Sequence, residues 1–113
     1  MKIINLTEFL KMPIGTIYSK YESCHFSGLM VKDMNSGEID FYYNDLIGNV
    51  DNENTGDFLD KCTEAEKSGK SLKLDFDIIG RDASYNKNQL FAVYEKEDIE
   101  GLVKTLINCE FKY

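Results

Sequence analysis

The segment "FSGLMVKDMNSGEIDFYY", residues 26–43, decides the fold class because it has the pattern of a β-hairpin. Its two halves, 26–32 and 38–43, look like strands, and the stretch between them, 33–37, has the chemistry of a turn. In the second half, apolar and polar side chains alternate with the period of two that is typical of a strand with one buried face. The sequence therefore predicts two antiparallel strands here.

Three further strands are predicted outside this hairpin. Residues 16–22 are rich in strand-favouring residues, and residues 90–95 form another strand-like run late in the chain. The clearest alternation lies at 72–78, where leucine, phenylalanine and isoleucine alternate with lysine and aspartate. Because neighbouring strands have short connections, the expected sheet is antiparallel.

Helix signals appear at three places. Asn5, followed three positions later by a glutamate, is a capping-box pattern, and the helix that it starts should end before Pro13. Residues 55–68 have apolar side chains at helical spacing, and Gly69 follows where a C-terminal cap belongs. Apolar positions within residues 99–107 mark an amphipathic third helix, and acidic residues occupy its first turn.

These elements predict a single α+β domain over residues 1–113. The expected order is α-β-β-β-α-β-β-α, with an antiparallel sheet of about five strands and with helices packed on one of its faces. The length suits one domain, and a hydrophobic content of 42% suits a modest core that needs no metal or disulfide support.

The charge and the cysteine content narrow the function classes. A net charge of −7 opposes binding to duplex nucleic acid, but it permits a basic protein partner, or a small anion where the few cations converge. The chain has no apolar run that could span a bilayer, and its start is too short for a signal peptide. The three cysteines match no disulfide framework and no zinc motif, so a reduced, cytoplasmic setting is expected.

The sequence contains few residues in arrangements that are typical of catalysis. His25 is the only histidine, and its neighbour Cys24 would point to the opposite face of a strand. Asp75 and Asp77 share one face of a predicted strand, where alternating charges usually mark the solvated side. With no glycine-rich nucleotide loop and no metal cluster, we expect a binding protein rather than an enzyme, with no catalytic residue, metal or cofactor.

The stretch "GRDASYNKNQLF", residues 80–91, is the candidate binding site. Residues 80–89 should form an exposed, non-helical connection between two strands, and Arg81, the only arginine, has a planar guanidinium that can grip phosphate or carboxylate. Aromatic rings nearby could stack on a base. The predicted ligand-binding residues are Arg81, Lys20, Tyr18, Tyr85, Phe91 and Asn86. In the alternative, Arg81 has a structural role and pairs locally with Asp82 or Asp77.

Three stretches, "MPIGTIYSKYES", "DFYYNDLIG" and "GRDASYNKNQLFAVYEKEDIEGLVKTL", resemble a group of small acidic proteins encoded in phages and prophages. The resemblance covers most of the chain and concerns its overall layout, with no catalytic signature to carry over. It implies an accessory protein that acts against host defences, either by blocking a defence protein or by sequestering a nucleotide immune signal. Known nucleotide sponges are similar in size and oligomeric, with pockets between subunits.

Two hypotheses follow. In the first, the protein sequesters a cyclic or ADP-ribose-type nucleotide signal without catalysis, as a homo-oligomer in which symmetry multiplies the scarce cations. In the alternative, it is an acidic inhibitor that covers the nucleic-acid-binding face of a host defence effector such as a CRISPR nuclease. The acidic segments 51–66 and 95–100 would then steer association. Both hypotheses place the protein in the cytoplasm of an infected bacterial host.

Overall fold

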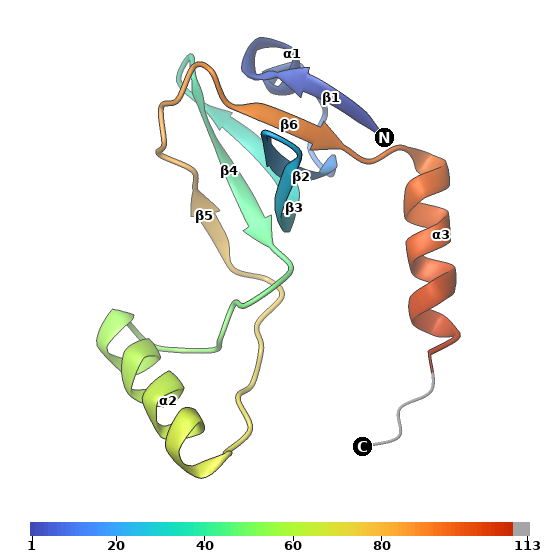
Figure 1. The fold of residues 1–113 in the computed structure, drawn as a ribbon. Coiled ribbons are helices and arrows are strands. Elements are labelled where there is room, and N and C mark those ends of the chain that lie inside the picture. The colour runs from blue at the N-terminus through green and yellow to red at the C-terminus, as the bar shows by residue number, and fades with distance from the viewer. Residues whose placement is uncertain (110–113) are drawn as a thin grey trace.

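A computed structural model of the chain describes residues 1–109 and shows an α+β fold built on one antiparallel sheet of six strands (Figure 1). Along the sheet the strands lie in the order β1-β6-β2-β3-β4-β5. The strands are β1 (Lys2–Asn5), β2 (Ile17–Glu22), β3 (His25–Ser36), β4 (Asp40–Asp45), β5 (Ile79–Arg81) and β6 (Leu90–Val93). The helices are α1 (Leu6–Leu10), α2 (Thr55–Ser68) and α3 (Lys96–Ile107).

The hairpin predicted within residues 26–43 is confirmed as the antiparallel pair β3–β4, but its turn lies later than expected. Residues 33–36 belong to β3, and the turn occupies residues 37–39. Between the pairs Lys32–Tyr43 and Asn35–Phe41, β3 has one residue more than β4, and the register of the ladder shifts by one there. The turn then falls at Gly37, whose φ of +70° suits glycine.

The predicted set of strands needs correction, because one predicted strand is absent and two observed strands were not predicted. The strand predicted at 72–78 is wrong: this segment is irregular, and a single bridge between Val50 and Leu74 is its strand-like contact. Alternation predicts two unlike faces but supplies no partner strand, and the neighbouring segment offers only short contacts around this bridge. The strand β1, which precedes α1 and pairs with β6, was not predicted, because four residues are too few to show a period. The same holds for the three-residue strand β5, which pairs with β4 and takes Gly80 and Arg81 out of the predicted 80–89 loop.

The helix predictions agree well with the structure. Asn5 caps α1, because its side chain accepts a hydrogen bond from the backbone of Glu8 at 2.9 Å. The helix α2 has the predicted bounds, and Gly69 closes it in the left-handed conformation, with φ at 71°. A capping box between Glu95 and Asp98 begins α3.

The core lies between α1 and one side of the sheet, which we call the core face. Phe9 from α1 is completely buried and stacks on Phe91, with 4.0 Å between the ring centroids. Its ring also meets Tyr18 and Phe41 edge-on, at 4.6 and 5.0 Å. Three strands and one short helix therefore share a single aromatic cluster.

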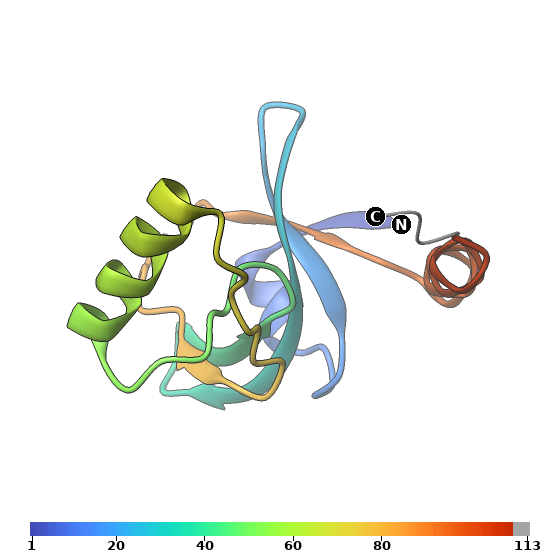
Figure 2. The same cartoon turned by 90° about the horizontal axis from the view of Figure 1, so that it is seen from below.

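The prediction that the helices pack on one face of the sheet holds only for α1. Neither α2 nor α3 has a buried residue, and Figures 1 and 2 show both helices projecting from the sheet, well apart from one another. The radius of gyration is 16.1 Å, whereas a compact domain of this length has roughly 13 Å. None of the three described helices has the length and apolar character that crossing a membrane requires.

Candidate binding surfaces

Arg81 ties the start of the 82–89 loop to the neighbouring strand. Its Nε lies 3.2 Å from Oδ2 of Asp40, a carboxylate that is almost fully buried, whereas Arg81 itself is half exposed. The other oxygen of Asp40 accepts a hydrogen bond of 2.8 Å from the backbone N–H of Ala83. The structural alternative for Arg81 is therefore favoured, although the partner is Asp40 rather than the expected Asp82 or Asp77.

We predict that Arg81→Ala destabilises the protein by about 1–2 kcal/mol, since it leaves a buried carboxylate without a cation. Within residues 1–109, Oδ2 of Asp40 accepts no aligned hydrogen bond that could compensate. Urea unfolding would measure the change, and Lys87→Ala, an exposed cation of the same loop, is the control, with an expected effect within about 0.5 kcal/mol. An unchanged unfolding midpoint together with lost nucleotide binding would identify Arg81 as a ligand clamp instead.

Lys20, the second predicted cation, is also paired. Its Nζ lies 2.6 Å from Oδ1 of Asp82, and the Ser84 hydroxyl donates to the other oxygen of Asp82 at 2.5 Å. Burial raises the pKa of Asp82, but the contacts with Lys20 and Ser84 outweigh burial and hold that pKa below its ordinary value. Lys20 pairs with the core residue Phe91, whereas Arg81 pairs with Tyr42, the neighbour of the core residue Phe41 on β4. Arg81 and Lys20 therefore lie on opposite faces of the sheet and do not converge on one anion.

The predicted stacking rings are divided between the core and the loop. The expectation that Tyr18 and Phe91 offer free ring faces is corrected, because both are buried against Phe9. Burial also raises the pKa of Tyr18, so its hydroxyl stays protonated. Tyr85 is half exposed and has a φ of 51° in the loop, which is exposed and non-helical as predicted. Asn86 is also exposed and accepts a hydrogen bond from the backbone of Asn88.

A small polar cavity of about 270 Å³ lies beside Lys20 on the core face. Besides Lys20, its ionisable lining includes the carboxylates Asp45 and Asp82, so acidic groups outnumber the cation. Burial, followed by these two carboxylates, raises the pKa of Tyr43, whose ring also lines the cavity. This cavity is the closest counterpart of the predicted ligand site, and its charge disfavours an anion.

A larger groove, of about 570 Å³, lies on the opposite face of the sheet between β3 and the start of α3. We call it the apolar groove; its lining is Met1, Ser19, Phe26, Gly28, Leu29, Tyr94, Asp98, Ile99 and Leu102. At its floor the hydroxyls of Ser19 and Tyr94 lie 2.6 Å apart, and Ser19 donates to the carbonyl of Gly28. The polar groups at the floor thus already have hydrogen-bond partners within the chain, and the walls of the groove offer mainly apolar contacts.

A β-bulge creates one wall of the apolar groove. Tyr18 pairs with Met30 and Lys20 pairs with Ser27, so two residues of β3 lie opposite Ser19. In a regular strand, residues 26 and 29 would face opposite sides of the sheet. The extra residue of the bulge allows Phe26 and Leu29 to line the groove together, a result that alternation in the sequence could not predict.

The apolar side of α3 continues from this groove into solvent. We call Ile99, Leu102, Val103, Leu106 and Ile107 the α3 stripe. The exposed fraction rises along the helix from 37% at Leu102 to 75% at Ile107. The sequence predicted this stripe correctly, but within residues 1–109 no residue of α3 is buried, so the expected packing on the chain's own sheet is not formed.

The segment 49–78, which we call the acidic lobe, carries α2 away from the sheet (Figure 1). It has eight carboxylates and four lysines, and so it accounts for −4 of the net charge of −7. Three of the lysines pair inside the lobe, with Asp57, Glu64 and Asp51. Four other carboxylates are exposed and have no ion pair within residues 1–109: Glu53, Asp60, Glu66 and Asp77.

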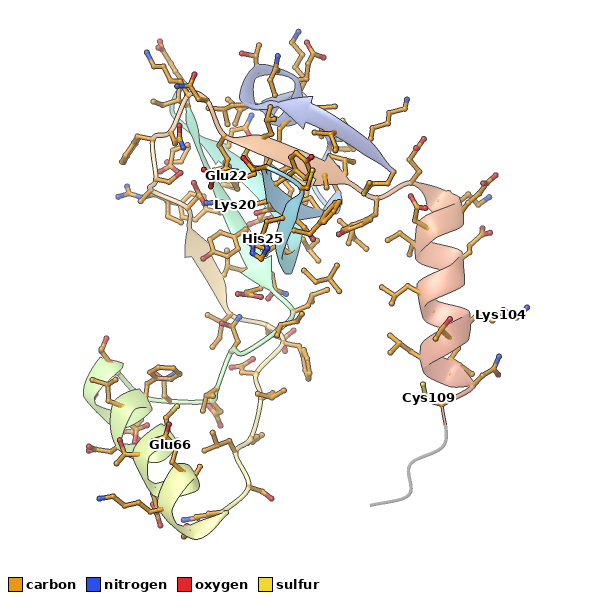
Figure 3. All side chains as sticks on the ribbon, viewed as in Figure 1. Lys20, Glu22, His25, Glu66, Lys104 and Cys109 are labelled. Atoms are coloured by element: carbon orange, nitrogen blue, oxygen red, sulfur yellow. The ribbon has the colours of Figure 1, made fainter. Side chains whose placement is uncertain are left out.

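Cys24 precedes the single histidine, His25, on the β2–β3 hairpin, whereas Cys62 lies on α2 and Cys109 follows α3. Figure 3 shows His25 on the β2–β3 hairpin near Lys20 and Glu22, whereas Cys109 lies at the far end of α3. Cys109 is exposed and Cys62 is partly exposed. Among residues 1–109, no three histidine, cysteine or acidic side chains are grouped as metal ligands would be.

Residues 1–109 form an α+β fold with an open antiparallel sheet, an apolar groove beside an amphipathic helix whose apolar side is exposed, and an acidic projection. No family model, curated protein or solved structure matches the chain.

Proposed function

We propose that this protein is a non-catalytic inhibitor that uses its acidic lobe to cover a basic surface of a protein partner. The observation that carries the proposal is the projection of α2 away from the sheet, with exposed carboxylates such as Asp60 and Glu66 free of lysine partners within the described residues. Such a surface attracts a cationic patch over long range and speeds association.

The resemblance to phage accessory proteins supplies the class of partner in this proposal. Nucleic-acid-binding proteins carry clustered lysines and arginines that neutralise phosphates. An acidic lobe that occupies such a cluster competes directly with the nucleic acid. The proposed target is therefore the nucleic-acid-binding face of a host defence effector, such as a CRISPR nuclease.

Sequestration of a nucleotide signal is the second candidate, and it is less well supported. What favours it is Tyr85, which is half exposed in the loop next to the Lys20–Asp82 pair. Against it, both predicted cations are paired and two of the three predicted stacking rings are buried. Calorimetry with a panel of cyclic and ADP-ribose-type nucleotides tests it, and binding at micromolar concentration that Tyr85→Ala abolishes would support it.

For the inhibitor, we predict that the double variant Asp60→Lys/Glu66→Lys slows association with the target at least about tenfold at low salt. The matched control is Glu22→Lys/Glu38→Lys, which changes the net charge equally at two exposed carboxylates outside the lobe. The readout is inhibition of DNA cleavage by purified RNA-guided nucleases, together with the association rate at low and high salt.

The control should retain most of the inhibition, because its charges lie away from the proposed contact. Equal losses in both variants would mean that net charge matters and the lobe does not. Failure of the unmodified protein to inhibit any nuclease in the panel would overturn the proposed class of partner.

A further inference from the structure

The amphipathic pattern of α3 predicts that its apolar side is buried, but the contacts within residues 1–109 leave the α3 stripe exposed. A helix with one apolar side normally turns that side toward a core. In α3 no residue is buried, and Val103, Leu106 and Ile107 are about half to three-quarters exposed. Contiguous apolar surface of this kind usually marks an interaction site.

The connection between β6 and α3 is fixed by hydrogen bonds and directs α3 away from the sheet. The backbone N–H of Tyr94 donates to the carbonyl of Ile17, which continues the β2–β6 ladder up to the helix. The next residue, Glu95, is the N-cap, and its backbone N–H donates to Asp98 at 2.9 Å. Because ladder and cap are adjacent, α3 has little freedom to fold back and cover the apolar groove.

The spacing of the apolar residues matches that of a helix pair. Ile99, Leu102 and Leu106 are separated by three and four positions, the a and d spacing of a heptad, and Cys109, two residues past the end of α3, continues that spacing. If two such helices pair antiparallel, Leu102 of each lies opposite Leu106 of the other, and Ile99 lies opposite Cys109. The same stripe then serves both partners, as a two-fold symmetric contact requires.

We propose that a second copy of this chain covers the α3 stripe. Two α3 helices pack antiparallel across a two-fold axis, and the end of each helix seats against the apolar groove of the other copy, where Ile99 already forms part of the wall. One symmetric contact thereby covers Ile99, Leu102 and Leu106 of the stripe together with the groove. The inference is independent of the proposed function, although such a dimer carries two acidic lobes.

The distribution of charge permits this contact between copies. The helix α3 has two lysines and three carboxylates, so it is close to neutral, whereas the acidic lobe accounts for −4. Figure 2 shows α2 and α3 on opposite sides of the molecule, so copies that meet at α3 keep their acidic lobes apart. Antiparallel packing also sets the positive end of each helix dipole beside the negative end of the other.

The length of α3 limits the size of the proposed dimer contact. A helix of 12 residues is about 18 Å long. A contact of one such helix pair and the two apolar grooves is small beside stable interfaces, which bury roughly 1,200–2,000 Å² in total. We therefore expect a dimer that dissociates on dilution rather than an obligate one.

The first test compares two leucines of nearly equal exposure, Leu106 on α3 at 58% and Leu59 on α2 at 57%. Analytical ultracentrifugation of the unmodified protein should show a species of twice the chain mass of 13.0 kDa. Leu106→Glu should yield a monomer with an unchanged circular dichroism spectrum, and Leu59→Glu should remain dimeric. A monomeric unmodified protein, or a dimer that survives Leu106→Glu, would overturn the proposal.

Cross-linking tests the antiparallel orientation. In a Cys24→Ser/Cys62→Ala background, Ile99→Cys should oxidise to a covalent dimer through Cys109 of the other copy. Within one chain, positions 99 and 109 are about 15 Å apart along the helix, which is too far for a disulfide. The added change Cys109→Ser should abolish the cross-link. A covalent dimer that forms through Cys109 alone, without Ile99→Cys, would indicate parallel helices and contradict the proposed arrangement.

A different occupant would give a different result. Suppose that the unmodified protein is monomeric, and that Leu106→Glu lowers inhibition of a nuclease while Leu59→Glu does not. The α3 stripe then binds that nuclease, and the proposed dimer is wrong. The proposed function is tested separately: it is wrong if the protein inhibits no nuclease, whether the protein is a monomer or a dimer.

Discussion

Replacing Phe9 with alanine should lower the free energy of unfolding by about 3–5 kcal/mol. Phe9 is fully buried, and its ring meets Phe91, Tyr18 and Phe41 at once. It is the central side chain that α1 places on the core face, so its removal leaves a cavity that the three strands cannot readily close. For a domain whose total stability is about 5–15 kcal/mol, such a loss is a large fraction.

Urea unfolding followed by circular dichroism would measure this loss. Phe76→Ala is the matched control, because it deletes the same side chain at a position that is 55% exposed. We expect the control to cost less than about 1 kcal/mol. If Phe9→Ala cost no more than Phe76→Ala, the sheet would have to close its core without α1, and our description of the aromatic cluster would be wrong.

The sequence predicted those parts of the fold that depend on local pattern. The bounds of α2 follow from its apolar spacing and from Gly69, and the β3–β4 pair follows from the alternation around Phe41. The strand predicted at 72–78 fails for a physical reason: alternation describes two faces, but a strand also needs a partner with a free edge. The bulge at Gly28 depends on pairing across β2, which no local pattern contains.

The candidate site was less predictable because its contacts are long-range. The sequence predicted a loop at 80–89 and singled out Arg81, but Gly80 and Arg81 belong to β5, and the partner Asp40 lies on another strand. Aromatic residues suit both a core and a base-stacking surface, so composition could not separate the buried Tyr18 from the exposed Tyr85. The α3 stripe was evident as a pattern, and its lack of a cover on the chain's own sheet became visible only in the fold.

Replacing Gly28 with alanine should destabilise the protein by roughly 2–5 kcal/mol, for two separable reasons. Gly28 has a φ of +73°, and an alanine in the left-handed region costs roughly 1–2 kcal/mol. In addition, a Cβ at this position would overlap Sδ of Met30, which belongs to the core cluster. Moving Met30 disturbs a packed core, and such overpacking costs about 1–3 kcal/mol.

Gly37→Ala separates the two contributions, because Gly37 has a similar φ of +70° and a Cβ added there would have no other side chain or distant backbone within 4 Å. The difference in unfolding free energy between the two variants should therefore be about 1–3 kcal/mol, the cost of displacing Met30. Equal losses would mean that Met30 moves aside freely. Because the bulge at Gly28 also brings Phe26 and Leu29 to the apolar groove, Gly28→Ala should weaken the dimer as well, whereas Gly37→Ala should leave its dissociation constant unchanged.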